Sequence, residues 1–189
     1  MATLGEVAVV LGLFAATTAT ALPQLLAGLD DARVAGAARY LSSRLAESRM
    51  DAIQRSREVA IRFTLTNNQY TYTVYADGNG NGVLSRDIQR GIDRPILGPE
   101  RLSDNFRNVE FGTQPGLPPI DSSSTAPGSD PIKLGTGNSV SFNAMGSATS
   151  GTIYLTGRSR VQYAVRVFGV TGKIRVYRFN RQTSTWLPL

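Results

Sequence analysis

Apolar residues dominate the first part of the chain. In the part that follows, they recur with the period of a helix. No charged residue occurs in 7–29, a run of 23 residues. As a helix, this run would be about 34 Å long, which is enough to cross the hydrocarbon core of a bilayer. After it, apolar residues recur at steps of three and four over 34–45. The pattern predicts one helix from about residue 3 to about residue 56, apolar all round in its first half and amphipathic in its second half.

The apolar run has a second interpretation, which is a cleaved secretory signal. Such a signal carries a basic segment before a shorter apolar core and a small-residue cleavage site after it. Here Glu6 stands before the run, and the residues after it lead straight into the helical pattern. We therefore expect a membrane-spanning or filament-core helix over residues 1–30, bent at Pro23, and a separate head over residues 31–189.

Alternation of apolar and polar residues replaces the helical period beyond residue 58. It predicts β-strands over 59–63, 69–75, 151–155, 161–167 and 173–179. Segments rich in proline, glycine and serine interrupt this pattern, so 86–106 is expected to be mostly loop and 113–138 a flexible surface insert. The fold class is therefore α+β, with the second half of the long helix packed on an antiparallel β-sheet head.

The last two expected strands form a hairpin whose register can be predicted. If they pair through the turn at 169–172, opposed residue numbers sum to 341, so that Val165 faces Val176 and Arg166 faces Arg175. One face is then apolar, while the other sets like charges opposite each other, which lowers stability. A phosphate backbone bound along that face would offset the charges, with Tyr177 available to stack on bases. The alternative is a solvated hairpin whose arginines oppose aggregation.

Charge and composition narrow the functional classes. The net charge is +6, yet every one of the 14 acidic residues lies at or before Asp130, and residues 131–189 carry eight basic residues and no acid. This asymmetry favours a polyanionic partner. The chain has no cysteine and no histidine, which excludes disulfides, thiolate metal sites and serine–histidine catalysis. The two lysines, Lys133 and Lys173, form no serine–lysine pattern, so we expect no enzyme.

The N-terminal segment 3–7, followed by the apolar run, resembles the start of mature type IV pilins and type II secretion pseudopilins. In that superfamily a glutamate precedes the membrane helix and a proline follows it by seventeen residues, the spacing of Glu6 and Pro23. The resemblance implies filament assembly in which Glu6 pairs with the N-terminal amine of a neighbouring subunit. A lone carboxylate at the edge of a bilayer is costly unless it is paired in this way.

The segments 46–55 and 59–63, together with Phe142 and Gly146, resemble the FimT/GspH group of minor pilins and pseudopilins. The likeness spans nearly the whole chain apart from the insert. It implies a subunit that waits in the inner membrane with a periplasmic head and then joins other pilins or pseudopilins in a filament. The basic hairpin favours a type IV pilus subunit. The alternatives are a minor pseudopilin of the type II secretion tip complex and a major filament subunit.

A DNA-binding motif, G-R-x-R, is associated with the pilus members of this group, and two segments resemble it. Residues 157–160 match by letters, and residues 172–175 match by position, with lysine for the first arginine. The alternative is a purely structural role. The predicted DNA-binding residues are Arg158, Arg160, Arg166, Lys173, Arg175, Tyr177, Arg178 and Arg181.

A calcium-like loop is the remaining candidate site. Asp77, Asn79 and Asn81 with the following glycine match the opening of a calcium-binding loop, where alternate oxygen ligands suit a hard cation. The glutamate expected at the twelfth position is missing, and Asp87 lies one position earlier. The alternative is a glycine-rich β-turn. If calcium binds, a calcium-dependent adhesin head becomes a further functional class; no other cofactor is expected.

Overall fold

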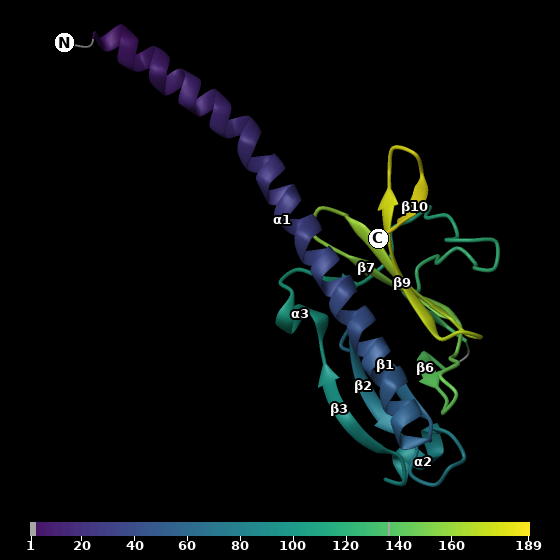
Figure 1. Ribbon diagram of the computed structural model, residues 1–189. Helices are drawn as coiled ribbons and strands as arrows, with labels where there is room; N and C mark the ends of the chain where they lie inside the picture. Colours follow the sequence, from purple (N-terminus) through teal and green to yellow (C-terminus); the bar gives the residue numbers. More distant parts are fainter. Residues whose placement is uncertain (1–2, 136) are drawn as a thin grey trace.

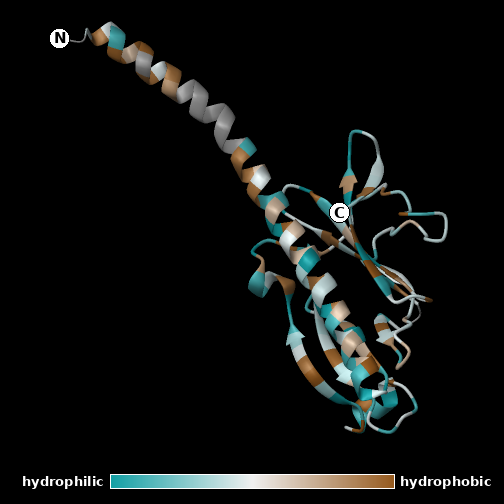
Figure 2. Ribbon diagram, viewed as in Figure 1, coloured by the Kyte–Doolittle hydropathy of each residue, from teal (hydrophilic) through white to brown (hydrophobic). Residues whose placement is uncertain are grey.

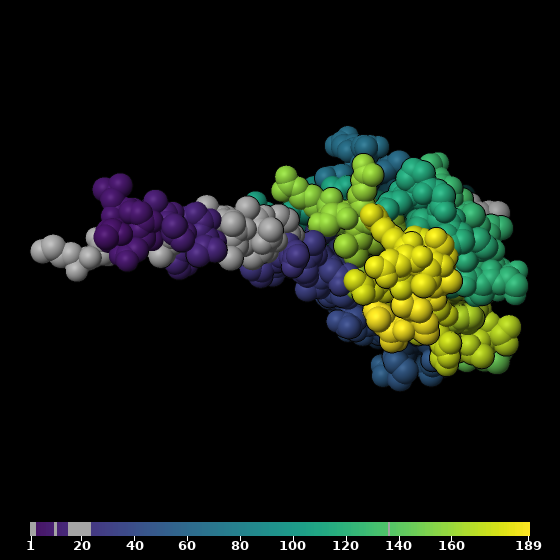
Figure 3. Space-filling view, turned by 90° about the horizontal axis from the view of Figure 1, so that it is seen from above, coloured from purple at the N-terminus to yellow at the C-terminus, as the bar shows by residue number. Residues whose placement is uncertain are grey.

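One long helix organises the molecule. The computed structural model describes residues 3–135 and 137–189, without the side chains of residues 10 and 15–23. Helix α1 (Leu4–Arg55) confirms the predicted long helix, and its N-terminal part projects away from the head (Figures 1 and 3). At its start, Thr3 and Glu6 form a capping box, in which each side chain accepts the backbone N–H of the other. At its end, Ser56 adopts the left-handed conformation.

The second half of α1 supplies one side of the core. Its fully buried side chains recur at helical steps, as the apolar stripe predicts: Val34, Ala38, Leu41, Leu45 and Ala52. They pack with buried residues of both sheets in one continuous core. Burial of each valine or leucine side chain in this set stabilises the fold by about 1.5–3 kcal/mol.

The first half of α1 lies outside the head. The predicted membrane segment 7–29 includes residues 15–23, so Pro23 and the predicted bend lie outside the described side chains. Among the side chains that are described, no helix is both long and apolar enough to cross a bilayer, and the predicted membrane span is not confirmed. Most of the described leucines of this part are more than 60% exposed, as Leu4, Leu25 and Leu26 illustrate. Figure 2 shows this apolar colouring on the projecting helix.

Two antiparallel sheets form the rest of the head, and α1 contacts strands of both. The first has the order β3-β2-β1-β6, comprising β1 (Val59–Thr66), β2 (Gln69–Ala76), β3 (Arg94–Glu100) and β6 (Ser139–Phe142). The second has the order β10-β9-β8-β7-β4, comprising β4 (Glu110–Phe111), β7 (Gly151–Thr156), β8 (Gln162–Phe168), β9 (Lys173–Asn180) and β10 (Thr185–Pro188), with β5 (Ile132–Leu134) also paired to β7. Short helices α2 (Ser85–Gln89) and α3 (Leu102–Asn105) lie in the connections.

The predicted hairpin has the predicted register. Val165 pairs with Val176, and Arg166 pairs with Arg175. The apolar face of β8 and β9 enters the core against α1, and Val165 and Val167 are fully buried. The position of the turn therefore predicts the register, and alternation within the two strands predicts the inward face.

The prediction that 86–106 is mostly loop is wrong, because α2 and α3 lie at its two ends and β3 runs through its middle. Pro95 and Pro99 did suggest a break, yet both fit on this edge strand, whose register with β2 is irregular. At the end of β3, Glu100 accepts hydrogen bonds from Tyr40 of α1 at 3.0 Å and from Tyr72 of β2. These side-chain contacts hold the strand in place where backbone pairing is incomplete.

The insert 113–138 is not surface loop throughout. Its last part forms β5, and Leu117 is only 6% exposed. The carbonyl of Pro118 accepts a hydrogen bond from the Trp186 indole of β10 at 3.0 Å, so the insert is attached to the second sheet. Its predicted flexibility stays a prediction, but the insert covers part of the outer face of the hairpin.

Candidate functional site

The predicted DNA-binding residues fall into two groups at opposite ends of the β8–β9 hairpin. Arg166, Lys173 and Arg175 lie toward the turn, whereas the other arginines lie toward the open end. Arg181 follows Arg175 by six residues and lies beyond the end of β9, about 20 Å away at the usual rise of a strand. The exposed cations therefore do not form one continuous row along the hairpin.

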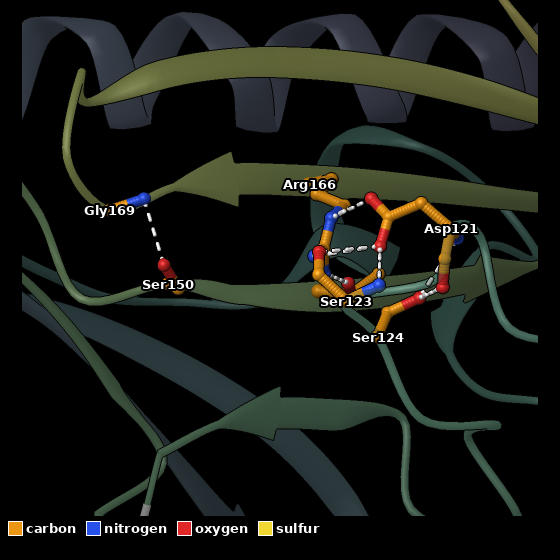
Figure 4. Close-up of polar contacts among 7 residues, drawn as sticks. Asp121, Ser123, Ser124, Ser150, Arg166 and Gly169 are labelled. Carbon is orange, nitrogen blue, oxygen red and sulfur yellow. Dashed lines mark hydrogen bonds and ion pairs between the residues drawn. The ribbon is translucent and has the colours of Figure 1, made fainter.

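Arg166 is buried rather than exposed to a partner. Its side chain is 7% exposed, and its Nε lies 2.8 Å from Asp121 Oδ2 in an ion pair. Its other nitrogens donate to Asp121 Oδ1 at 3.1 Å, Ser123 Oγ at 2.8 Å and Thr152 Oγ1 at 3.0 Å (Figure 4). The charge of Arg166 is therefore offset from outside the acid-free segment 131–189, by Asp121 of the insert, 45 residues away in sequence.

Asp121 stays ionised at neutral pH in this environment. Burial raises the pKa of its carboxyl group, but hydrogen bonds from Ser123 and the charge of Arg166 outweigh that effect, so the pKa lies below its usual value. Asp121 also accepts the backbone N–H of Ser123 at 3.0 Å. The insert thus presents a preformed anion to the buried guanidinium.

Tyr177 and Arg178 are also engaged within the protein. Tyr177 is 9% exposed and packs with Tyr154 and Ala164, so its ring is not open to a base. Arg178 forms an ion pair with Asp31 of α1 at 3.1 Å, and Asp31 also accepts a hydrogen bond from Tyr163 at 3.0 Å. Arg178 therefore helps to hold the second sheet against α1.

The first G-R-x-R segment is bound to α1 through its backbone. The carboxylate of Asp30, only 4% exposed, accepts the backbone N–H groups of Arg158 at 3.2 Å and Ser159 at 2.6 Å. A Cβ on Gly157 would lie 2.6 Å from a methyl group of Val34, so only glycine fits here. Gly157 of this segment is therefore explained by its close packing against α1. The side chains of Arg158 and Arg160 remain exposed, and Arg181 donates to the carbonyl oxygen of Arg160.

The second segment, 172–175, presents its cations freely. Gly172 has φ +59°, and a Cβ there would lie 2.0 Å from the carbonyl oxygen of Gly146, so the tight contact requires glycine. Lys173 and Arg175 are exposed. Within residues 3–135 and 137–189, neither of them has an ion-pair partner.

The calcium-like loop is held by hydrogen bonds within the protein. Asp77 accepts backbone N–H groups of Asn79 at 3.0 Å, Gly80 at 2.7 Å and Gly82 at 3.0 Å. Burial raises the pKa of Asp77, but these N–H donors outweigh it and bring the pKa below its usual value. Asp87 is likewise occupied by the side-chain amide of Asn81 at 3.1 Å. The described part of the chain contains no group of three acidic side chains placed to hold a metal.

We expect calcium to leave thermal stability unchanged, whereas Asp77→Asn lowers it. The substitution weakens three charge-assisted hydrogen bonds, for an expected loss of about 2 kcal/mol. Melting temperatures by circular dichroism, with millimolar calcium and with EDTA, would measure both effects. A calcium-dependent rise in the wild type that is absent in Asp77→Asn would establish the ion site instead.

Of the two predicted assembly residues, Glu6 has a described side chain. Glu6 is exposed, and its carboxylate accepts the Thr3 backbone N–H at 2.8 Å. Pro23 lies outside the described side chains. The assembly role of both residues stays a prediction.

Comparison with known proteins places this head in a family. The family model "Type II transport protein GspH" matches residues 37–171, well over half of the chain. Among solved structures, the minor pseudopilin EpsH from the Type 2 Secretion System of Vibrio cholerae is similar, with 10% identity, a TM-score of 0.47, and coverage of 76% of this chain and 95% of that one. No curated protein sequence matches. The matched residues run from the buried half of α1 to the turn of the β8–β9 hairpin, so the predicted likeness is confirmed and the chain belongs to the GspH family of the type IV pilin and pseudopilin superfamily.

Proposed function

We propose that this protein is a minor pseudopilin of a type II secretion system, built into a short pseudopilus with sister pseudopilins. Members of its family are structural subunits rather than enzymes, and pilin-like subunits assemble with one another. The comparisons fit this function at least as well as a type IV pilus subunit. The observation that carries the proposal is the projecting half of α1 with its uncovered apolar side chains.

Those side chains form a surface that the head does not cover. Leu4, Val9 and Leu11, near the start of α1, and Leu25 and Leu26, near the head, are all more than 60% exposed. Removing each from water is favourable by about 1.5–3 kcal/mol. Packing against the helices of neighbouring subunits supplies that burial in a filament. Before assembly, the proposed cover is the inner membrane, which the helix enters with the head in the periplasm.

Glu6 is suited to select a neighbour at the start of this helix. Its carboxylate is exposed, and its partner in the structure is a backbone N–H of its own chain. In the proposed filament it exchanges this contact for the N-terminal amine of the adjacent subunit. A charge-assisted pair in an apolar surrounding is stronger than the exposed capping bond that it replaces.

Site-directed cross-linking tests the assembly. Because the native chain has no cysteine, Leu26→Cys introduces a single thiol. We expect it to cross-link through a short bis-maleimide to sister pseudopilins that carry cysteine at the matching helix position. Glu6→Gln in the same background should reduce the yield several-fold. Thr183→Cys, exposed in the β9–β10 turn, is the matched control and should give no such product. Equal yields from the two cysteines would contradict the proposal.

The second candidate is a DNA-binding minor pilin of a type IV pilus. The exposed pair Lys173 and Arg175 favours it, whereas the burial of Arg166 and Tyr177 removes two of the predicted contacts. A chromosomal deletion separates the candidates. Loss of secreted enzyme with normal DNA uptake supports the pseudopilin, and the reverse supports the pilus subunit.

A further inference from the structure

A cavity of about 440 Å³ opens beside the turn of the β8–β9 hairpin. The insert and the β6–β7 connection form one side of it, through Ser123 and Ser150, and the hairpin forms the other. Alternation along β8 directs Val165 and Val167 to the core and Arg166 to the opposite face. The cavity therefore lies on the sheet face away from α1, where helix packing in a filament leaves it accessible.

The lining of the cavity has an excess of positive charge. Arg166, Lys173 and Arg175 contribute three cations, and Asp121 offsets only Arg166. Arg175 faces Arg166 directly across the ladder. Like charges placed opposite each other lower stability. An anion that enters the cavity is attracted by Lys173 and Arg175 at once and reduces this repulsion.

The cavity also provides a hydrogen-bond donor and an apolar wall. The Ser150 hydroxyl accepts the Gly169 backbone N–H at 2.8 Å (Figure 4), which leaves its own hydrogen free to donate. The Phe168 ring lies beneath the Arg166 guanidinium, and the Arg166 Cζ atom is 5.4 Å from the centroid of that ring. Val170, at the tip of the turn, is 94% exposed. A ligand that fits this lining carries a carboxylate next to an apolar group.

We propose that this cavity binds an acidic segment of a partner protein, with a carboxylate between Lys173 and Arg175 and an adjacent aliphatic side chain against Phe168 and Val170. A nucleic acid fits less well, because its backbone needs a row of cations. The next arginine of β9, Arg178, lies on the opposite face of the strand and pairs with Asp31, and Arg181 lies beyond the end of the strand. The inference goes beyond the proposed function, since it concerns a face of the head that α1 does not use.

Fluorescence anisotropy with the full chain in mild detergent tests the proposal. The probe is a fluorescein-labelled peptide of alternating glutamate and leucine. The comparison probes are the same peptide with glutamine for glutamate, and a labelled single-stranded oligothymidine. We expect the glutamate peptide to bind at low salt and the glutamine peptide not to bind.

Two variants and one control locate the site. Lys173→Gln/Arg175→Gln should weaken binding of the glutamate peptide roughly tenfold, because two charge contacts are lost. Arg90→Gln/Arg158→Gln removes the same charge from exposed positions elsewhere and should leave binding unchanged. Val170→Glu keeps both cations but supplies an internal carboxylate at the cavity rim, and it should also weaken binding.

Each contrary result overturns the proposal. Equal losses in the two double variants would show general attraction to a basic protein. Binding of the glutamine peptide as tightly as the glutamate peptide would exclude a carboxylate site. Tighter binding of oligothymidine that depends on Lys173 and Arg175 would assign the surface to nucleic acid. Because all the substituted residues are exposed, melting temperatures should stay close to that of the wild type and verify folding.

Discussion

Asp30→Ala is expected to lower the free energy of unfolding by about 3 kcal/mol, because it leaves two backbone N–H groups beside α1 without their acceptor. Asp30 is 4% exposed, and its carboxylate joins α1 to the backbone of Arg158 and Ser159. Each hydrogen bond to a charged group contributes about 1.5–3 kcal/mol, and the alanine also leaves a small void. In a chain of this size, the loss corresponds to a fall in melting temperature of roughly 6–12 °C.

Thermal unfolding of the full chain in detergent, followed by circular dichroism, measures this loss. Asp30→Asn retains one acceptor oxygen and should fall between alanine and the wild type. Asp104→Ala, at an exposed position, controls for the removal of one negative charge. If Asp30→Ala has the same melting temperature as Asp104→Ala, the carboxylate does not hold the 157–159 segment as described.

Arg166→Met is expected to have the next largest effect, a loss of about 2–4 kcal/mol. It removes the partner of Asp121, whose pKa the guanidinium helps to lower, and it deprives Thr152 and Ser123 of a hydrogen-bond donor. Breaking a buried pair by removing one member costs about 3–5 kcal/mol, and the partial exposure of Asp121 reduces that figure.

A double-mutant cycle separates this pair from simple loss of packing. Asp121→Leu alone should also destabilise, since it leaves the Arg166 charge buried. Arg166→Met/Asp121→Leu should be more stable than the sum of the single losses predicts, by at least about 1 kcal/mol, because neither charge is then left alone. Additive losses would mean that the two side chains are not coupled.

The strongly periodic elements were predictable from the sequence for a physical reason. In α1 and in the β8–β9 hairpin, the apolar residues that face the core lie a fixed number of positions apart, so local spacing determines the buried face. The spacing predicts that Val165 faces Val176, and the structure confirms this pair. β3 was missed because its prolines are compatible only with an edge strand, and the position of a strand in a sheet is a tertiary property.

The candidate site was harder to predict because its contacts join distant segments. Nothing near Arg166 in sequence points to Asp121, and the irregular insert that carries Asp121 has no periodicity. Asp30 and Asp31 looked like ordinary helix residues, although they bind the 157–159 segment and Arg178. The turn chemistry around Asp77 is recognisable from the sequence, but the three backbone N–H groups that its carboxylate accepts become visible only in the structure.

The position of Asp30 and Asp31 has a mechanical consequence. They stand where α1 leaves the head, and from there the helix runs on to Arg55, about 39 Å further at its usual rise. Both sheets contact this stretch, so a thrust along the helix axis is shared between them as shear rather than concentrated on one strand. In the proposed filament, the two aspartates together with the contacts to both sheets would transmit force along the helix axis to the whole head.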